Sequence, residues 1–131
     1  MRCFEILNLS DGGKPASNLN FLDRNDALRY QKMLLWPFEN LGYMPMSDGR
    51  RLKLNEVHLK VEPRMIPGAY DAALDWVLWH KDGKLGYSPV VPGRCFDASE
   101  WREVPQADRL DPMRAPLLAE AERHLLDNRF D

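Results

Sequence analysis

The dipeptide Asp82-Gly83 constrains the fold of this chain more than any other short stretch, because it lies at the centre of the segment "WVLWHKDGKLGYSPV", residues 76–90. An Asp-Gly pair favours a two-residue turn with positive φ at both positions, and such a turn joins antiparallel strands. A two-residue loop here also fixes the register of the strands, with four opposed pairs: Trp76–Pro89, Leu78–Tyr87, Trp79–Gly86 and His80–Leu85. The sequence therefore predicts a β-hairpin over residues 76–89.

The two faces of this predicted hairpin differ in composition. One face carries six mostly apolar residues, and we expect it to pack against a helix: Trp76, Leu78, His80, Leu85, Tyr87 and Pro89. On the other face we expect Trp79 to lie across the bare backbone of Gly86. A helix over residues 71–79 that ends near Gly83 is the alternative. Alternation, cross-strand pairing and turn chemistry agree on the hairpin.

Periodicity also predicts the elements of the N-terminal part. Alternating apolar residues indicate a strand over residues 2–9, and a loop rich in Gly and Ser follows at residues 10–18. Apolar residues at helical spacing predict a helix that begins near Asp23. Pro37 must end or kink this helix, because proline lacks the backbone N–H. One further turn is expected to stop at Gly42.

The rest of the chain contains one further strand and two further helices by the same criteria. Residues 51–62 predict a strand whose alternation changes phase, so a bulge or tight turn is needed at Asn55–Glu56. Residues 63–68, which include two prolines and a glycine, are expected to break the regular secondary structure after this strand. Asp97 precedes a possible short helix, and a final helix is expected to begin at Asp111, with four residues forming an apolar stripe: Leu117, Leu118, Ala121 and Leu125.

These elements together predict an α+β fold. We expect a single domain over residues 1–131, with about four strands in a largely antiparallel sheet that two main helices cover on one face. A ferredoxin-like arrangement is one variant of this architecture. A chain of 131 residues is long enough to bury a core without metal or disulfide support.

Charge and cysteine content indicate which partners and which cellular compartment suit the protein. The net charge is −2, so bulk electrostatics favour neither nucleic acid nor a membrane surface. Residues 1–65 carry ten Lys and Arg against eight Asp and Glu, whereas residues 66–131 carry eight against twelve. There is no secretory signal at the start, no apolar run long enough to cross a bilayer, and no CxxC pattern around Cys3 or Cys95. We therefore expect a cytoplasmic protein with reduced thiols.

Catalytic signatures are sparse. Cys95 lies beside Arg94 and before a possible helix, a setting that can activate a thiol, so a small hydrolase or transferase could use Cys95 with His80 and a carboxylate such as Asp97. A buried, inert cysteine is the alternative. His58 and His124 each have a Glu nearby at strand or helix spacing, which also suits a solvated surface. None of the three histidines has a second ligand at a metal-binding spacing, so we expect no metal and no cofactor.

Surplus aromatic residues favour a binding function. The stretch "LLWPFENLGYMPM" predicts a protein-binding surface made by Trp36, Phe38, Tyr43 and Met46. The leading expectation is a small non-enzymatic protein that acts by contact with another protein, such as an inhibitor, an immunity protein or an accessory protein of a mobile element or phage. Weak binding of single-stranded nucleic acid is a further alternative, using the aromatic hairpin and four bases: Arg50, Arg51, Lys53 and Lys60.

Overall fold

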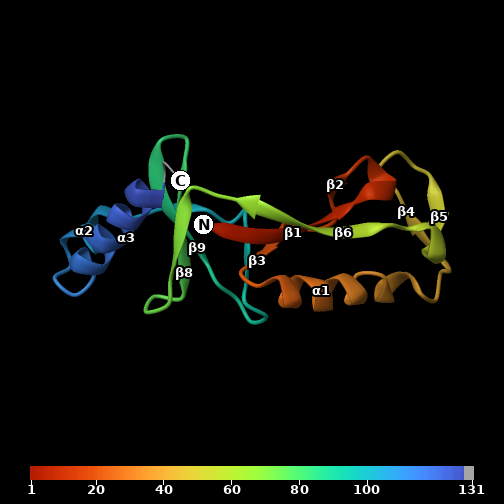
Figure 1. Ribbon diagram of the computed structural model, residues 1–131, viewed down its shortest axis with the longest axis horizontal. Coiled ribbons are helices and arrows are strands. Elements are labelled where there is room, and N and C mark those ends of the chain that lie inside the picture. Colours follow the sequence, from red (N-terminus) through yellow and green to blue (C-terminus); the bar gives the residue numbers. More distant parts are fainter. Residues whose placement is uncertain (129–131) are drawn as a thin grey trace. The chain divides into compact units, whose positions relative to one another are not determined.

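The computed structural model describes the backbone of residues 1–128, and the side chains in that range except those of residues 108, 109, 117, 121 and 124–128. The described chain is mostly β (Figure 1). It contains eleven strands in three sheets: β1 Arg2–Asn8, β2 Lys14–Pro15, β3 Leu19–Phe21, β4 Tyr43–Pro45, β5 Arg51–Lys53, β6 Leu59–Met65, β7 Gly68–Asp71, β8 Trp76–Lys81, β9 Lys84–Pro89, β10 Cys95–Asp97 and β11 Arg102–Glu103. Three α-helices accompany them: α1 Arg24–Met33, α2 Gln106–Leu110 and α3 Ala115–Asn128. The predicted α+β fold, with one sheet of about four strands under two main helices, is therefore wrong.

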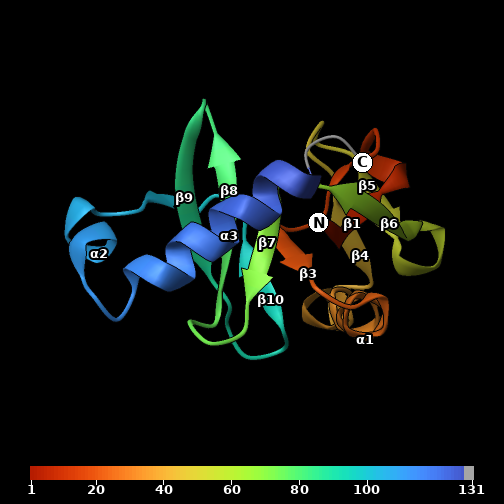
Figure 2. The ribbon, with the colours of Figure 1, turned by 60° about the vertical axis from the view of Figure 1, so that its left-hand side comes forward.

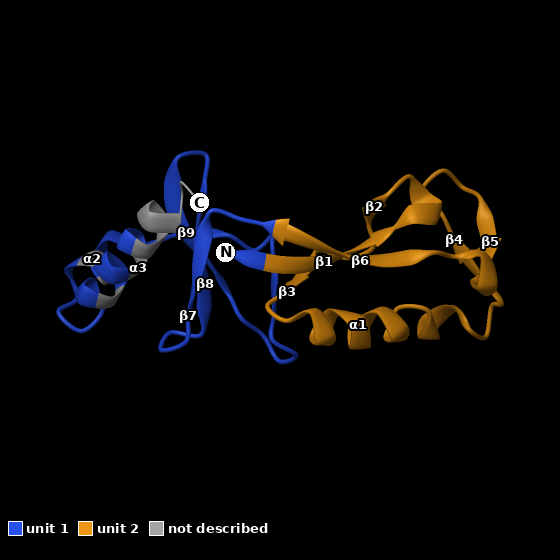
Figure 3. Ribbon diagram, viewed as in Figure 1, with its two compact units in different colours: residues 1–2, 65–131 blue, residues 3–64 orange. Residues whose placement is uncertain are grey.

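The chain divides into two compact units (Figure 3). Unit 1 comprises residues 1–2 and 65–131, and unit 2 comprises residues 3–64. Unit 2 is thus inserted between the second residue and the remainder of unit 1. The expectation of one domain over residues 1–131 stays a prediction.

The sheet of unit 1 is built around the predicted hairpin. Its strand order is β11-β9-β8-β7, and all neighbours are antiparallel. Asp82 and Gly83 have φ values of 54° and 76°, as a two-residue turn of this kind requires. The register is confirmed at every predicted pair, including Trp76 opposite Pro89 and Leu78 opposite Tyr87. The alternative helix over residues 71–79 is wrong, because these residues form the β7–β8 turn and most of β8.

One face of the hairpin packs against helix α3, as expected. The core cluster of unit 1 joins side chains from β8, β9, the segment after β11 and α3: Trp76, Leu78, Leu85, Val104 and Leu118. Figure 2 shows α3 lying along the sheet formed by β7, β8 and β9. The indole of Trp76 also contacts the ring of Tyr87, with ring centroids 4.5 Å apart. The apolar side chains on this face of β8 are buried by this packing.

The opposite face of the hairpin is buried by a different tryptophan from the one expected. Trp101 covers Gly86 so closely that a Cβ atom at Gly86 would lie 2.1 Å from its ring. The indole Nε1 of Trp101 donates to the Trp79 carbonyl oxygen at 3.1 Å. The side chain of Trp79 instead donates from Nε1 to Ser88 Oγ at 2.9 Å in the interior. The prediction that Trp79 lies across Gly86 is therefore wrong.

Unit 2 contains a sheet in which β1 pairs with β2, β3 and β6. Helix α1 begins where the sequence places it, because the Asp23 carboxylate accepts a hydrogen bond from the Asn25 N–H at 2.7 Å. The helix lies along unit 2 (Figure 1), with Ala27 fully buried and the Tyr30 ring in contact with Phe21. Gln31 Nε2 also donates to the Leu59 carbonyl oxygen at 2.7 Å.

The phase change in residues 51–62 marks a change of sheet. β5 ends at Lys53, a short 3-10 helix η3 occupies Leu54–Glu56, and β6 starts at Leu59. The predicted tight turn is confirmed, and it separates two strands instead of interrupting one. The expected interruption at residues 63–68 is wrong over its first part, because β6 continues through Pro63 to Met65. The predicted loop over residues 10–18 likewise contains β2.

The region after β9 differs most from expectation. Asp97 accepts from the N–H and the hydroxyl of Ser99 and so stabilises a turn after β10, not a helix. Asp111 caps the turn that leads into α3, since its carboxylate accepts from the Met113 N–H at 2.9 Å. Of the predicted apolar stripe, Leu118 is buried. The other three side chains of that stripe, those of Leu117, Ala121 and Leu125, lie outside the described residues. The side chain of His124 lies outside them too.

Candidate protein-binding surface

Three large apolar side chains are exposed within ten consecutive residues of unit 2. Met33, Trp36 and Leu41 are 45%, 59% and 56% exposed. They come from the last residue of α1, the following 3-10 helix η2 (Trp36–Phe38) and the turn after it. Exposed tryptophan is costly to leave in water and is concentrated at the centres of protein interfaces. We call residues 33–42 the Trp36 segment.

Backbone hydrogen bonds fix the shape of the Trp36 segment. The N–H of Phe38 donates to the Leu35 carbonyl at 3.0 Å, and the N–H of Glu39 donates to the Trp36 carbonyl at 3.2 Å. The segment ends where the N–H of Gly42 donates to the Phe38 carbonyl at 3.0 Å, with Gly42 at a φ of 75°. A surface held by its own hydrogen bonds loses little conformational entropy when a partner binds.

The four predicted contact residues occupy different environments. Trp36 is exposed, Phe38 and Tyr43 are half-buried, and Met46 is 5% exposed. Met46 belongs to the interior of unit 2, where its sulfur lies 3.7 Å from Asn8 Nδ2. The structure therefore brings Trp36 and parts of Phe38 and Tyr43 to the surface, whereas Met46 cannot contact a partner without a change in the fold.

Sequence reasoning missed Met33 and Leu41. Met33 is the last residue of α1 and precedes Trp36 by three residues. Neither belongs to the apolar stripe of α1, whose residues are buried or half-buried. Apolar residues that fall off the buried stripe were the signal that could have identified both side chains.

Bases flank the Trp36 segment on the exposed side of α1. Arg29 and Lys32 precede Met33 and Trp36 at helical spacing, and both are exposed. Arg29 forms an ion pair with Asp26, whereas Lys32 forms no ion pair within the described part of the chain. The surface thus combines apolar side chains with positive charge at one border.

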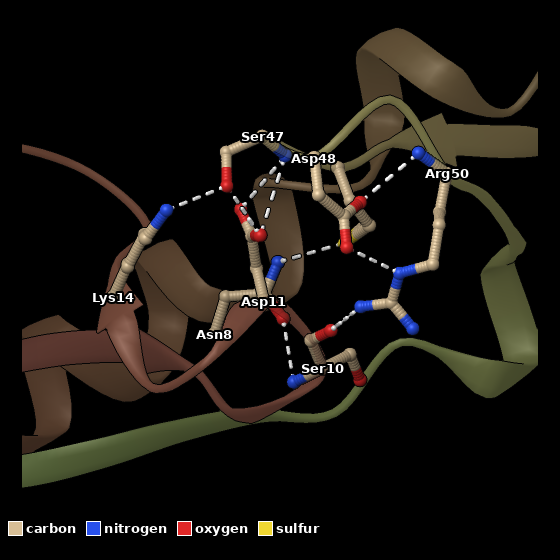
Figure 4. A network of polar contacts seen from close by, with 8 residues as sticks. Asn8, Ser10, Asp11, Lys14, Ser47, Asp48 and Arg50 are labelled. Atoms are coloured by element: carbon tan, nitrogen blue, oxygen red, sulfur yellow. Dashed lines mark hydrogen bonds and ion pairs between the residues drawn. The ribbon is translucent and has the colours of Figure 1, made fainter.

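A polar network stabilises the turn between β4 and β5 (Figure 4). The Asp11 carboxylate accepts from the Ser47 hydroxyl at 2.7 Å and from the Ser47 N–H at 3.2 Å. Lys14 Nζ donates to the same hydroxyl at 2.8 Å. Arg50 contacts Asp48 through Nε at 2.6 Å and the Ser10 carbonyl through a guanidinium nitrogen at 3.0 Å. These contacts link the turn to the end of β1.

The bases of the nucleic-acid alternative are exposed, but three of them interact with neighbouring side chains. Arg50 pairs with Asp48, and the pKa of Asp48 is lowered, chiefly because the Arg50 backbone N–H donates to its carboxylate. Arg51 lies over the Tyr43 ring at 4.8 Å, and Lys60 pairs with Glu62 at 2.6 Å. Lys53 is exposed.

The aromatic residues of the hairpin are poorly placed for stacking on bases. Trp76 and Trp79 are buried and Tyr87 is half-buried. Base stacking requires an accessible ring face. The two hairpin tryptophans therefore supply none of the stacking surface that the nucleic-acid alternative needs, and Tyr87 supplies only part of a ring.

The residues of the enzyme alternative do not form an accessible site either. Cys95 is 4% exposed, and its sulfur lies 3.9 Å from the Pro92 carbonyl oxygen. His80 is half-buried on β8, opposite Leu85. A substrate could reach the Cys95 sulfur only after local opening of the chain.

Two further properties of the described residues bear on the kind of site present. Among the described residues, no three His, Cys, Asp or Glu side chains gather closely enough to hold a metal ion. Within the same part of the chain, no helix has the length and apolar character needed to cross a membrane. No family model, no curated protein and no solved structure matches this chain.

Proposed function

We propose that this protein is a non-enzymatic protein-binding module and that the Trp36 segment is its contact surface. The exposure of Trp36 on a hydrogen-bonded turn carries this proposal. A large aromatic ring held in place by the backbone is the usual anchor of a protein interface. Met33 and Leu41 are the other exposed large apolar side chains of the segment, and Phe38 is half-buried.

The proposed partner presents an apolar pocket with acidic groups at one border. The pocket receives Trp36, and the acidic border faces Arg29 and Lys32. Charges at the border of an interface mainly raise the association rate, whereas the buried anchor sets the dissociation rate. An inhibitor, an immunity protein or an accessory protein would act in this way. We further propose that it acts in the cytoplasm, where free cysteines such as Cys3 and Cys95 are common.

Affinity purification followed by measurement with a purified partner tests the proposal. Wild-type protein and the Trp36→Ala variant are each used to isolate interacting proteins from the native host. Met113→Ala is the matched control, since Met113 is an 82% exposed apolar residue of unit 1. Any protein lost only with Trp36→Ala is then purified, and its affinity for the three forms is measured by calorimetry.

The expected result is a direct complex that Trp36→Ala weakens by about 30-fold or more, the effect of losing an anchor residue. Met113→Ala should leave the affinity unchanged. The thermal midpoint of Trp36→Ala should stay within about 2 °C of wild type, since an exposed side chain contributes little to stability. A complex that forms equally well with both variants would rule out the Trp36 segment as the contact surface.

A further inference from the structure

The two-stranded sheet of unit 2 has one blocked edge and one open edge. β4 and β5 pair with Tyr43 opposite Lys53, Met44 opposite Leu52 and Pro45 opposite Arg51. The N–H of Met46 donates to the Arg50 carbonyl at 2.7 Å, so residues 46 and 50 are a hydrogen-bonded pair. Hydrogen-bonded and non-hydrogen-bonded pairs alternate along an antiparallel ladder. The peptide groups at residues 43, 45, 51 and 53 therefore point away from the partner strand.

Proline decides which edge can accept another strand. On β4, one of the two outward positions is Pro45, which has no N–H to donate. On β5, both outward positions have an N–H, at Arg51 and Lys53. In the described part of the chain neither N–H donates to a backbone group outside the β4–β5 ladder, and no further strand pairs with β5. The edge of β5 therefore has outward N–H groups that could pair with an additional strand.

The side chains of β5 indicate what such a strand would contain. Arg51 and Lys53 lie on one face and are exposed, whereas Leu52 lies on the other face and is half-buried. Residues directly opposite on a neighbouring strand bring their side chains within contact distance. A strand beside β5 would therefore need acidic residues opposite Arg51 and Lys53 and an apolar residue opposite Leu52.

We propose that the edge of β5 binds an extended acidic segment of another protein by strand addition. The segment alternates acidic and apolar residues, and it forms main-chain hydrogen bonds with the N–H groups of Arg51 and Lys53. A second copy of this chain is a poor occupant, since antiparallel pairing of two β5 strands about Leu52 would set Arg51 against Lys53. This inference goes beyond the proposed function, because it uses no side chain of the Trp36 segment.

A synthetic peptide provides the probe. The peptide acetyl-Glu-Val-Glu-Val-Glu-Val-amide has the required alternation, and its binding is followed by chemical-shift changes in ¹⁵N-labelled protein. Two matched peptides separate main-chain pairing from charge attraction. One has the same sequence with N-methylated Glu residues, which removes donors without changing charge, and the other has Lys in place of each Glu. We expect shifts at Arg51–Lys53 with the first peptide and none with the two controls.

Two substitutions at Lys53 separate the same contributions in the protein. Lys53 has a φ of −59° and a ψ of 146°, a conformation that proline adopts without strain. Lys53→Ala removes only the charge, whereas Lys53→Pro removes the charge and the outward N–H. We expect Lys53→Pro to weaken binding by about tenfold more than Lys53→Ala, the effect of one lost hydrogen bond. Lys60→Ala, on β6, should bind as wild type does.

Several outcomes would overturn strand addition at β5. These are equal binding of the N-methylated peptide, equal affinities of Lys53→Pro and Lys53→Ala, or shifts that avoid residues 51–53. The thermal midpoint of each variant establishes that it is folded, and the peptide comparison uses wild-type protein only. Peptide binding by Trp36→Ala should be unchanged, so failure here and failure of the proposed function are distinguishable.

Discussion

The thiol of Cys3 is buried beside polar groups of unit 2. Its sulfur lies 3.8 Å from Asn20 Oδ1 and 3.5 Å from the Arg64 carbonyl oxygen. Burial raises the pKa of Cys3 to about 11, because the thiolate loses its hydration, and the Arg64 guanidinium opposes part of that rise. Cys3 is therefore a neutral core residue at physiological pH and not a nucleophile.

The raised pKa of Cys3 predicts a loss of stability in alkaline solution. The thiol ionises near pH 9 in the unfolded chain and near pH 11 in the folded one. The contribution of the neutral thiol is thus complete below about pH 9 and is lost as the pH rises toward 11. Urea unfolding between pH 8 and pH 11 should show wild type losing on the order of 2 kcal/mol more than Cys3→Ala.

This difference isolates Cys3 from other groups that titrate in the same range. The pKa of Tyr70 is also raised, chiefly because its hydroxyl donates to Asp75 at 2.8 Å. Tyr70 is present in both proteins, so its contribution cancels in the comparison. Parallel pH profiles for wild type and Cys3→Ala would show that the Cys3 thiol is hydrated in the folded state.

The contact between Gly86 and Trp101 predicts a large steric effect from one methyl group. A Cβ at Gly86 would lie 2.1–2.4 Å from three atoms of the indole, so the ring must move and its hydrogen bond to the Trp79 carbonyl must break. Gly86→Ala should destabilise the protein by about 2–4 kcal/mol. The measurement is chemical unfolding of the two single variants and the double variant.

Trp101→Ala supplies the control for this prediction. With the ring absent, Gly86→Ala should cost less than about 1 kcal/mol, giving a coupling free energy of at least about 1 kcal/mol in the double-mutant cycle. Additive effects of the two substitutions would place the cost in the backbone of β9 and not in the contact with Trp101.

At the scale of elements, the stability of the turn between β8 and β9 depends on the backbone conformation of its two residues and not on side-chain packing. Gly83 has a φ of 76°, and no atom lies within 4 Å of a Cβ built there. Gly83→Ala should therefore cost about 1 kcal/mol through backbone strain, lowering the thermal midpoint by roughly 3–5 °C. Asp82→Asn, at a φ of 54°, should leave the midpoint unchanged within about 1 °C, because Asn tolerates this region well. Equal midpoints for wild type and Gly83→Ala would contradict this account of the turn.

Elements whose signals are local could be predicted from the sequence. The Asp82-Gly83 turn, the Asp23 cap of α1 and the strand β1 each arise from signals within a few neighbouring residues, and the structure confirms all three. The short strands β2, β4, β7 and β11 have only two to four residues each. Such strands form because a strand distant in sequence supplies their hydrogen bonds. The apolar periodicity of two to four residues is too short to predict that partner.

The same limit explains the errors around the hairpin and the Trp36 segment. Alternation correctly assigned Trp79 and Gly86 to one face, but it could not show that Trp101 from a later segment occupies the space above Gly86. Composition correctly marked residues 34–46 as rich in apolar side chains. It could not separate exposed Trp36 from buried Met46, because burial depends on contacts such as that of Met46 with Asn8.

At the scale of the whole molecule, two strands join the two units covalently. The boundary between the units falls after residue 2, inside β1, and after residue 64, inside β6. β1 and β6 are also paired with each other. Unfolding of either unit would disrupt strands that the other unit shares. We therefore predict that the described chain unfolds in one cooperative transition, as the expected single domain would.

A matched pair of core substitutions tests this cooperativity. Ile6 of unit 2 and Ile66 of unit 1 are both buried, and Ile→Val at either position should cost about 1 kcal/mol by removing one methylene. In a single transition, each variant lowers the same thermal midpoint by roughly 3–5 °C, and the double variant lowers it by the sum. Scanning calorimetry should then give one peak whose calorimetric and van't Hoff enthalpies agree. Two peaks, each displaced by only one of the substitutions, would mean that shared strands do not couple the units and that the chain contains two domains.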